Sequence, residues 1–480
     1  MSFSMTSRVR RGIALSAVVL ATGGLVLYRA PAAASPGDPG AAHVLANGKN
    51  SAAFAGPGVH GMISLSHTRV LSGQDTTVFA DVRVVADLPI ETSTLTVGRA
   101  PISLAVVLDT SGSMSGEKIE EARRSVLRLL ADMRDDDEIT VIRYSDTSEL
   151  IQPLARVGSI RQALSARIAR LDASGGTNIP SGLAHGLRAL DEATRGRVRR
   201  IVLVSDGLDS TRAQAENLAR SSFASGITVS SLGIGLDFDE SYMGSLAQSG
   251  HGNFAFVKDG ASLAKFLHRE LEETVGTTVE NARVRLQLPE GMRFVSATGA
   301  DAVVNGNQVE LAVGSLFAGD ERRVVVELAA STYRSEVGTF DIDATASWNQ
   351  VGGASFTTRA PRLSLVATAD ASEVNRGKDG AVLASATSVV ASQRQIEAAN
   401  AYASGDVARA AQIAEKNEQA LAAAMVAAPA PAATSLDTQM KAYRSMRKGF
   451  ATVSPKSAEG RAAAKEAAVK DMGNMNRSTF

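Results

Sequence analysis

The sequence predicts an α/β domain with a Rossmann-like, doubly wound and mostly parallel sheet, inserted in an antiparallel β-sandwich and followed by an α-helical C-terminal region. Three patterns lead to this prediction. Residues 100–275 alternate apolar runs of strand length with amphipathic segments of helical period. Residues 59–99 and 276–368 alternate polar and apolar side chains with a period of two, which is typical of half-buried antiparallel strands. Residues 369–480 are rich in alanine and have a helical period.

The first 34 residues have the three-part pattern of a secretory signal peptide or a membrane anchor. Three arginines among the first eleven residues precede an uncharged run over residues 12–28, and Ala32-Ala33-Ala34 then offers a cleavage site. The run is slightly long for a signal peptide and at the short limit for a membrane-spanning helix, so both alternatives stay open. In either case we expect an exported protein, located in the periplasm, in the cell envelope or outside the cell.

A linker and the first part of the predicted sandwich follow. Residues 35–58 are rich in proline, glycine, alanine and asparagine, which predicts a flexible linker. Within residues 59–99, the segment from Val78 to Val84 has an apolar residue at every second position. Because a few short strands cannot bury a face by themselves, we expect them to share a sandwich with strands in residues 276–368.

The α/β domain, residues 100–275, contains apolar runs that predict strands and amphipathic segments that predict helices. The strands are expected at Ile102–Leu108, Glu138–Tyr144, Arg200–Ser205, Thr228–Leu232 and Asn253–Phe256, with an antiparallel edge strand at Ser148–Pro153. The helices are expected at Glu117–Met133, Ile160–Leu171, Ile179–Ala193, Thr211–Phe223 and Ala261–Glu273. This alternation predicts helices on both faces of the sheet.

The C-terminal region, residues 369–480, is predicted to be helical. Ala399–Asp406 has the pattern of a helix end, a C-terminal glycine and the N-cap of the next helix, which predicts a helical hairpin. Met425–Thr434 is rich in alanine and proline and predicts a linker. The end of the region, near Ala462–Val469, predicts a loosely attached helix or partial disorder.

The composition excludes several classes of function. Lysine plus arginine and aspartate plus glutamate each number 50, so no net positive charge is available to attract nucleic acid. The absence of cysteine excludes disulfides, thiolate metal sites, cysteine nucleophiles and a cysteine-linked lipid anchor. The sequence has neither a Walker lysine loop nor a G-x-S-x-G elbow. We therefore expect no nucleic-acid partner and no enzymatic activity.

Two clusters of like charge flank the predicted strands of the α/β domain. Arg195, Arg197, Arg199 and Arg200 are interpreted as a solvated loop or, alternatively, as a contact for an acidic partner. Asp135–Glu138 is interpreted as an exposed acidic turn, because four adjacent acids do not have the spacing of a metal loop.

Three separated segments place oxygen-bearing side chains next to predicted strand ends. Asp109, Ser111 and Ser113 follow the first strand, Thr177 lies in a glycine-rich turn before a helix, and Asp206 follows a second strand. Open α/β sheets bind ligands at the carboxyl ends of their strands, and oxygen ligands suit a hard cation such as Mg²⁺. Taken alone, the first segment is also typical of a helix-capping turn, and the third of a strand-end turn.

The order Asp-x-Ser-x-Ser, Gly-Gly-Thr and Ser-Asp-Gly resembles the metal-ion-dependent adhesion site (MIDAS) of the von Willebrand factor A (VWA) family. The resemblance covers about a third of the chain. It implies that the hydroxyls of Ser111, Ser113 and Thr177 bind Mg²⁺ directly, with Mn²⁺ or Ca²⁺ as alternatives. It also implies that Asp109 and Asp206 act mainly through bound waters.

A cation held mainly by hydroxyls keeps much of its positive charge, and an open coordination position on it attracts a carboxylate. We therefore expect an exported, non-enzymatic module for protein binding or cell adhesion. It would grip an aspartate or glutamate carboxylate of a protein partner through Mg²⁺, with residues 12–28 inserted in the membrane if they are not removed. The alternative is an accessory or scaffold subunit of an envelope assembly or maturation complex, in which the metal is structural.

Overall fold

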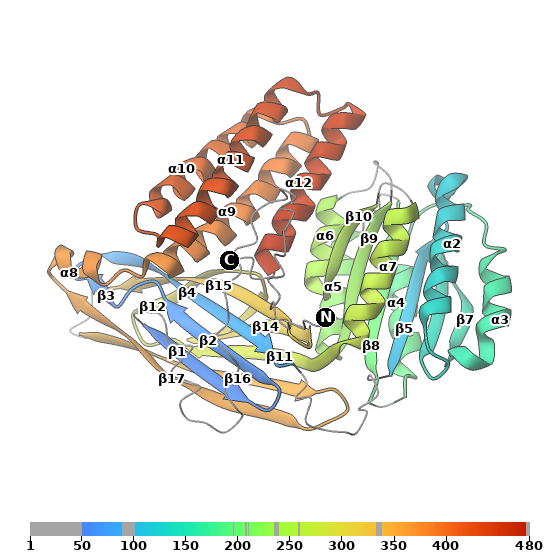
Figure 1. The fold of residues 1–480 in the computed structure, drawn as a ribbon, viewed down its shortest axis with the longest axis horizontal. Helices are drawn as coiled ribbons and strands as arrows, with labels where there is room; N and C mark the ends of the chain where they lie inside the picture. Colours follow the sequence, from blue (N-terminus) through green and yellow to red (C-terminus); the bar gives the residue numbers. More distant parts are fainter. Residues whose placement is uncertain are drawn as a thin grey trace, which may run out of the picture.

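The structure is a computed structural model that describes residues 50–88, 101–194, 196–206, 209, 211–234, 240–257, 260–332 and 338–476. The described chain forms an α/β unit, a β-sandwich and a C-terminal helical unit (Figure 1). The predicted signal peptide or anchor, and the predicted linker up to residue 49, lie outside the described residues. None of the helices in the described ranges combines the length and the apolar character needed to cross a membrane.

The α/β unit is built on a six-stranded sheet in the order β10-β9-β8-β5-β6-β7. Its strands are β5 (Ile102–Asp109), β6 (Glu138–Tyr144), β7 (Ser148–Arg156), β8 (Val198–Ser205), β9 (Ile227–Ile234) and β10 (His251–Val257). All pairs are parallel except β6 with the edge strand β7. Every residue of the central strand β5 is buried, as expected for a strand covered on both faces. The predicted fold class is confirmed.

Helices cover both faces of this sheet, and each face has its own apolar core. One core is formed by α2 (Glu117–Asp132), α3 (Val157–Ile168) and α7 (Gly260–Val275). The other core is formed by α4 (Ile179–Asp191), α5 (Arg212–Ala224) and α6 (Glu240–Ser249). The helix α6 was not predicted; it is one of the shorter helices of the unit, with 10 residues.

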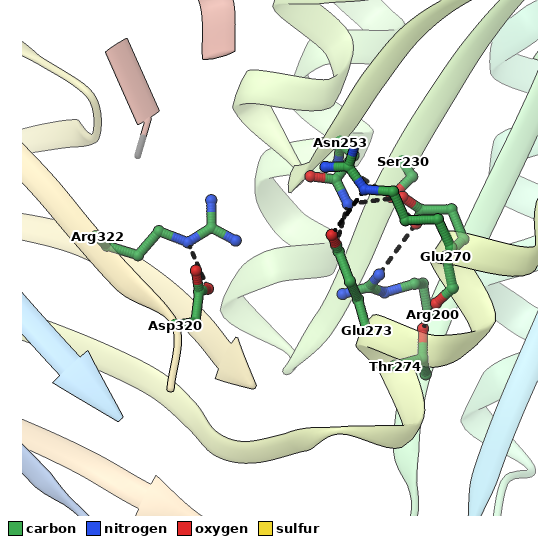
Figure 2. A network of polar contacts seen from close by, with 9 residues as sticks. Arg200, Ser230, Asn253, Glu270, Glu273, Thr274, Asp320 and Arg322 are labelled. Atoms are coloured by element: carbon green, nitrogen blue, oxygen red, sulfur yellow. Dashed lines mark hydrogen bonds and ion pairs between the residues drawn. The ribbon is translucent and has the colours of Figure 1, made fainter. Parts of the chain in front are cut away.

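A buried polar network fastens α7 to the sheet (Figure 2). The Arg200 guanidinium on β8 pairs with the Glu270 carboxylate on α7 at 3.0 Å, and both side chains are buried. Ser230 on β9 and Asn253 on β10 donate hydrogen bonds to the same carboxylate, at 2.5 and 2.6 Å. One helical carboxylate therefore joins three neighbouring strands to α7.

The two charged clusters are solvated only in part, and Arg195 lies outside the described residues. Arg197 and Arg200 are buried, and the Arg197 guanidinium lies 3.4 Å from the Glu138 carboxylate, which is buried as well. Asp137 is also buried, so the predicted exposed acidic turn is wrong for its last two residues. The partners in these ion pairs are 59 to 70 residues apart in the chain, a separation that hides the pairing from sequence patterns.

Two sheets form the sandwich, in the orders β1-β2-β4-β15-β12 and β13-β14-β11-β16-β17-β3. The strands before the α/β unit are β1 (Ser51–Gly56), β2 (Val59–Leu65), β3 (Arg69–Leu71) and β4 (Asp75–Ala86). Those after it are β11 (Thr277–Gln287), β12 (Met292–Thr298), β13 (Asp301–Asn305), β14 (Gln308–Phe317), β15 (Glu321–Ser331), β16 (Thr339–Gln350) and β17 (Ser355–Thr368). The strand β4 pairs antiparallel with β15 along its length, so the α/β unit is inserted in the sandwich.

The strand β1 lies in the segment that was predicted to be a linker, so the linker prediction is wrong at its C-terminal end. Its small residues Ala52 and Ala53 are buried together with Phe54. Phe54 pairs with Gly61 on β2, where a Cβ atom would lie 2.2 Å from the Phe54 ring. Within the predicted linker itself, a Cβ atom on Gly56 would lie 2.6 Å from the Trp348 ring, so a glycine that suggests flexibility in the sequence instead leaves room for an aromatic side chain.

The C-terminal unit consists of α8 (Ala371–Arg376), α9 (Gly380–Ala403), α10 (Val407–Met425), α11 (Ala430–Thr452) and α12 (Ala458–Asn476). The predicted hairpin is confirmed: Gly405 has a φ of 94°, and the Asp406 side chain accepts a hydrogen bond from the Arg409 amide. The predicted linker at 425–434 is wrong beyond residue 429, where α11 begins. The segment near Ala462–Val469, predicted to be a loosely attached helix or partly disordered, lies in α12, and its Ala467 and Ala468 pack on α9.

The three units contact one another. The fully buried Arg323 on β15 donates hydrogen bonds to the Ser385 hydroxyl on α9 (3.2 Å) and to the Asn474 carbonyl on α12 (3.4 Å). The Ser385 hydroxyl in turn donates to Asp81 on β4 (2.6 Å). The helix α12 also contacts β10 and α6 of the α/β unit, as Figure 1 shows. The helical unit therefore braces both the sandwich and the α/β unit.

The close packing of β1 on β2 predicts that Gly61→Ala lowers the free energy of unfolding by about 1–3 kcal/mol. The added methyl group would meet the Phe54 ring and, at 2.4 Å, the Arg83 carbonyl oxygen. Gly449→Ala is the matched control, because a Cβ atom at this position of α11 meets nothing within 4 Å. Chemical denaturation measures both variants, and a Gly61→Ala protein as stable as the parent would contradict the described register of β1 and β2.

The contact between the α/β unit and the sandwich predicts a dependence of stability on pH. His251 on β10 packs on the Phe223 ring and beside Gly314 of β14, and burial lowers its pKa to about 3, with Arg322 and Arg283 contributing. The Asp301 carboxylate lies 3.9 Å from the imidazole, which does not offset the burial. Because the unfolded imidazole gains a proton below its ordinary pKa of 6.5 and the folded one does not, stability is lost as pH falls from 6.5 toward 3.

We therefore expect His251→Asn to remove part of the stability loss between pH 6.5 and pH 4, while the difference from the parent is constant above pH 7.5. Asparagine tolerates the positive φ of this position, 53°. Urea denaturation of the parent and the variant at several pH values measures this. Parallel pH profiles for the two proteins would contradict the burial of a neutral imidazole.

Candidate metal-binding site

The predicted site residues lie on three loops at the carboxyl edge of the α/β sheet. The first loop follows β5, the second precedes α4, and the third follows β8. Strands β5 and β8 are parallel neighbours with Leu108 opposite Val204, so Asp109 and Asp206 leave adjacent strands at the same edge. The spacing in sequence therefore becomes proximity in space, as predicted.

Backbone hydrogen bonds join the first loop to the second. The Gly112 amide donates to the Gly175 carbonyl at 2.9 Å, and the Ser174 amide donates to the Thr110 carbonyl at 2.7 Å. Thr110 is also bound to β6, because its amide donates to the Tyr144 carbonyl at 2.8 Å. These bonds fix the first two loops relative to each other without using the predicted ligand side chains.

A chain of hydrogen bonds, each with at least one side-chain partner, connects four of the five predicted residues. Asp109 Oδ1 accepts from the Ser111 amide at 2.8 Å, and the Ser111 and Ser113 hydroxyls lie 3.0 Å apart. The Ser113 hydroxyl then donates to Asp206 Oδ1 at 2.7 Å. On the other side, Asp109 Oδ2 accepts from the Ser205 hydroxyl at 2.7 Å, a contact that was not predicted.

Thr177, the fifth predicted residue, lies two positions beyond Gly175 and is half-buried. The turn before it needs glycine, because a Cβ atom on Gly175 or Gly176 would lie 2.5 Å from a carboxylate oxygen of Asp146, and Gly175 has a φ of 84°. After it, the Asn178 side chain caps α4 by accepting from the Ser181 amide at 3.0 Å. Thr177 is therefore held between a tight turn and a helix cap.

Three further residues that were not predicted shape the site. Asp209 in the third loop accepts hydrogen bonds from the Ile179 amide at 2.6 Å and from the Thr211 amide at 2.7 Å, which joins this loop to the start of α4. The Lys118 ammonium forms an ion pair with Asp206, and Asp146 packs on the glycine turn. These three charged residues do not form a recognisable spacing in the sequence, so the sequence gave no signal for their roles at the site.

The site carries concentrated negative charge away from water. Asp109 and Asp206 are both buried, and the burial of Asp109 raises the pKa of its carboxyl group, with the neighbouring Asp206 charge adding to the rise. Ser113 is exposed, so one side of the site opens to solvent. Two carboxylates and several hydroxyls thus face one another at a rim that a ligand can reach.

The donor set fits a divalent cation only if hydroxyls complete it. In the described parts of the chain, no three His, Cys, Asp or Glu side chains cluster closely enough to hold a metal ion. The hydroxyls of Ser111 and Ser113 stand between the two carboxylates and are within hydrogen-bond distance of each other. Oxygen donors of this kind suit Mg²⁺, Mn²⁺ or Ca²⁺ rather than the softer transition metals.

Residues 103–269 match the family model of the von Willebrand factor type A domain. The chain contains a VWA domain. Domains of this family generally mediate protein–protein interaction, often with a divalent metal. Among curated proteins, the chain is similar to the uncharacterized protein YfbK of Escherichia coli, with 29% identity over 38% of this chain and 33% of that protein. It is also similar to the human inter-alpha-trypsin inhibitor heavy chain H4, with 26% identity over 48% of this chain and 24% of that protein.

The matched part of the chain thus spans about a quarter to a third of these two relatives. Similarity in fold extends further. A von Willebrand factor type A protein from Catenulispora acidiphila matches 89% of this chain and 97% of its own, with a TM-score of 0.64 and 17% identity. The ArnB paralog VWA2 from Sulfolobus acidocaldarius matches 88% of this chain and 100% of its own, with a TM-score of 0.54 and 15% identity. The fold around the VWA domain is therefore shared with solved structures.

The hydrogen bonds of Asp209 predict that Asp209→Ala lowers the free energy of unfolding of the VWA domain by about 1–3 kcal/mol. The variant leaves the amides of Ile179 and Thr211 without their present acceptor. Asp172→Ala is the matched control on the second loop, because its side chain is 90% exposed and its ion pair with Arg123 contributes little. Equal losses for the two variants in thermal or urea unfolding would show that Asp209 does not join the third loop to α4.

Proposed function

We propose that the VWA domain binds a protein partner by holding a divalent cation, Mg²⁺ in the first place, that accepts a carboxylate of the partner. The role is binding rather than catalysis. The observation that carries this proposal is the hydrogen-bonded chain from Asp109 through Ser111 and Ser113 to Asp206, which gathers oxygen donors from two adjacent strand ends at an accessible edge.

The proposed ligand roles follow the family pattern and fit the burial of each residue. The hydroxyls of Ser111, Ser113 and Thr177 would bind the cation directly, and Asp109 and Asp206 would orient its bound waters. The carboxylates are well placed for this role, because Ser205 and Ser111 donate hydrogen bonds that fix Asp109 beneath the loop. A first shell of neutral hydroxyls leaves the cation its positive charge, which would attract an acidic partner.

The partner would meet the site on the side where Ser113 is exposed. The chain has as many basic as acidic residues, so its net charge does not attract partners of one sign. The bound cation would instead supply a local positive charge at the site. An aspartate or glutamate side chain of a protein is the ligand that best fits a single open position. Export, inferred from the pattern of residues 1–34, would place this contact in the periplasm, the cell envelope or outside the cell.

The alternative function is a scaffold or accessory subunit in which the metal only stabilises the loops. The contacts among the three units favour a role as a rigid part of an assembly, since Arg323 joins the sandwich to two helices of the helical unit. The two functions differ in what the cation does. For a binding module the partner needs the cation, whereas for a scaffold the partner binds equally well after chelation.

Ser113→Ala tests the metal site at an exposed position, and Lys118 still pairs with Asp206 after the Ser113 hydroxyl is lost. We expect the affinity for Mn²⁺, measured by titration calorimetry, to fall by roughly tenfold or more, since a direct ligand is lost. Ser115→Ala is the matched control in the same loop, because its exposed hydroxyl donates to the Gly112 carbonyl instead. Equal Mn²⁺ affinity for Ser113→Ala and the parent would contradict the assigned ligand set.

Capture of partners from an envelope extract, with Mg²⁺ and with chelator, separates the two functions. A binding module retains its partner with Mg²⁺ and releases it with chelator, and Ser113→Ala captures less than Ser115→Ala does. Capture that is the same with and without Mg²⁺ would contradict metal-dependent binding and support the scaffold.

A further inference from the structure

We infer that Lys118 is a tethered counter-ion of the metal site: its ammonium neutralises Asp206 when no divalent cation is bound and must leave when one binds. The inference rests on the proposed metal site and concerns how that site exchanges its cation. It assigns a role to a residue that contributes no oxygen donor and is not one of the five proposed ligands.

The first observation is the sharing of the Asp206 carboxylate. Lys118 donates to Asp206 Oδ2, and Ser113 donates to Asp206 Oδ1 at 2.7 Å. The Asp206 side chain is fully buried, while that of Lys118 is 29% exposed. Among the ion pairs of the described residues, Lys118 is the only cationic partner of Asp206. A divalent cation bound to the Ser113 hydroxyl would therefore lie next to the ammonium group.

The second observation is the position of Lys118 on its helix. It is the second residue of α2, and the acidic residues Glu117 and Glu120 stand on either side of it in the first turn. A positive side chain at a helix N-terminus is opposed by the helix dipole, whereas acidic residues there are favoured. The helix dipole therefore opposes a lysine at this place, and the ion pair that the structure shows for Lys118 is the one with Asp206.

The charges of Asp109, Asp206 and Lys118 lie close together at the site. Without a cation, the buried charges of Asp109 and Asp206 would repel each other, and their charge would be costly to hold out of water. Lys118 compensates part of this charge, so the loops can keep their arrangement without metal. A divalent cation placed beside the ammonium is repelled by it in turn, which lowers the affinity for metal.

The side chain has a route away from the site. Lysine carries its charge on a flexible four-carbon stem, and the ammonium already reaches solvent. Glu121 is three residues further along α2, a spacing at which opposite charges meet on a helix surface. Moving Lys118 out to solvent or to Glu121 would clear the carboxylate for the waters of a bound cation.

The test is a Mn²⁺ titration, by calorimetry, of the full chain and three variants. Lys118→Gln removes the charge and should bind Mn²⁺ about tenfold more tightly than the parent, whereas Lys118→Arg keeps the charge and should bind like the parent. Arg128→Gln is the matched control: it removes an exposed positive charge from the same helix, about 15 Å further along its axis. It should change the affinity by less than about twofold, since exposed charges at that distance are screened.

A second measurement uses the unaltered protein and does not depend on the folding of a variant. Mass spectrometry follows the rate at which an amine-reactive reagent modifies Lys118, with chelator or with about 10 mM Mg²⁺, which is roughly tenfold above the dissociation constant of a weak cation site. The rate should rise several-fold with Mg²⁺, because the ammonium leaves Asp206, while the rate at the exposed Lys416 stays the same.

The outcomes separate this inference from the proposed function. If the parent binds Mn²⁺ and Lys118→Gln binds it equally or more weakly, or if Mg²⁺ leaves Lys118 modification unchanged or slower, the counter-ion role is overturned and the metal site stands. If neither the parent nor Lys118→Gln binds Mn²⁺, both the metal site and the counter-ion role are overturned. If Lys118→Gln binds Mn²⁺ more tightly but partner capture ignores the metal, the counter-ion role is supported and the binding function fails.

Discussion

The carboxylates of Asp109 and Asp206 are held out of water at the ends of two adjacent parallel strands, and the surrounding loops are arranged around this buried charge. Backbone and hydroxyl donors fix Asp109, while Ser113 and Lys118 share Asp206. Such a concentration of negative charge costs free energy unless donors or a cation compensate it. Ser113 is exposed beside these buried charges, and this is the edge at which we propose that a divalent cation binds.

The rest of the fold holds that edge in place. The central strand β5 is buried along its whole length. The ion pair between Arg200 on β8 and Glu270 fastens α7 to the sheet. The pairing of β4 with β15 joins strands from before and after the inserted domain in one sheet of the sandwich. The helical unit adds a third contact through Arg323. The α/β unit therefore has packed contacts with the helical unit as well as strands of the sandwich on both sides of it in the chain.

The sequence was sufficient for the features that depend on local pattern. The period of the apolar residues predicted the mostly parallel sheet and its antiparallel edge strand, and the pattern around Gly405 and Asp406 predicted the helical hairpin. The order of the three loops placed Asp109 and Asp206 at one edge. Features that depend on long-range pairing were missed. Arg197 and Arg200 looked solvated because their carboxylate partners are far away in the chain, and β1 looked flexible because its small residues serve close packing. Lys118 and Asp209 have no distinctive spacing, so only the folded loops show what they contact.

Anomalous scattering from crystals grown with Mn²⁺ is the sharpest test of the metal site, because it locates the cation without reference to any partner. We expect one strong peak about 2.1–2.2 Å from the hydroxyl oxygens of Ser111 and Ser113, near the distances typical of small divalent cations. Asp206 would then face the bound waters, with the Lys118 ammonium moved away from it. Crystals with Mn²⁺ that show no peak at this edge, and Lys118 still paired with Asp206, would rule out a metal site here.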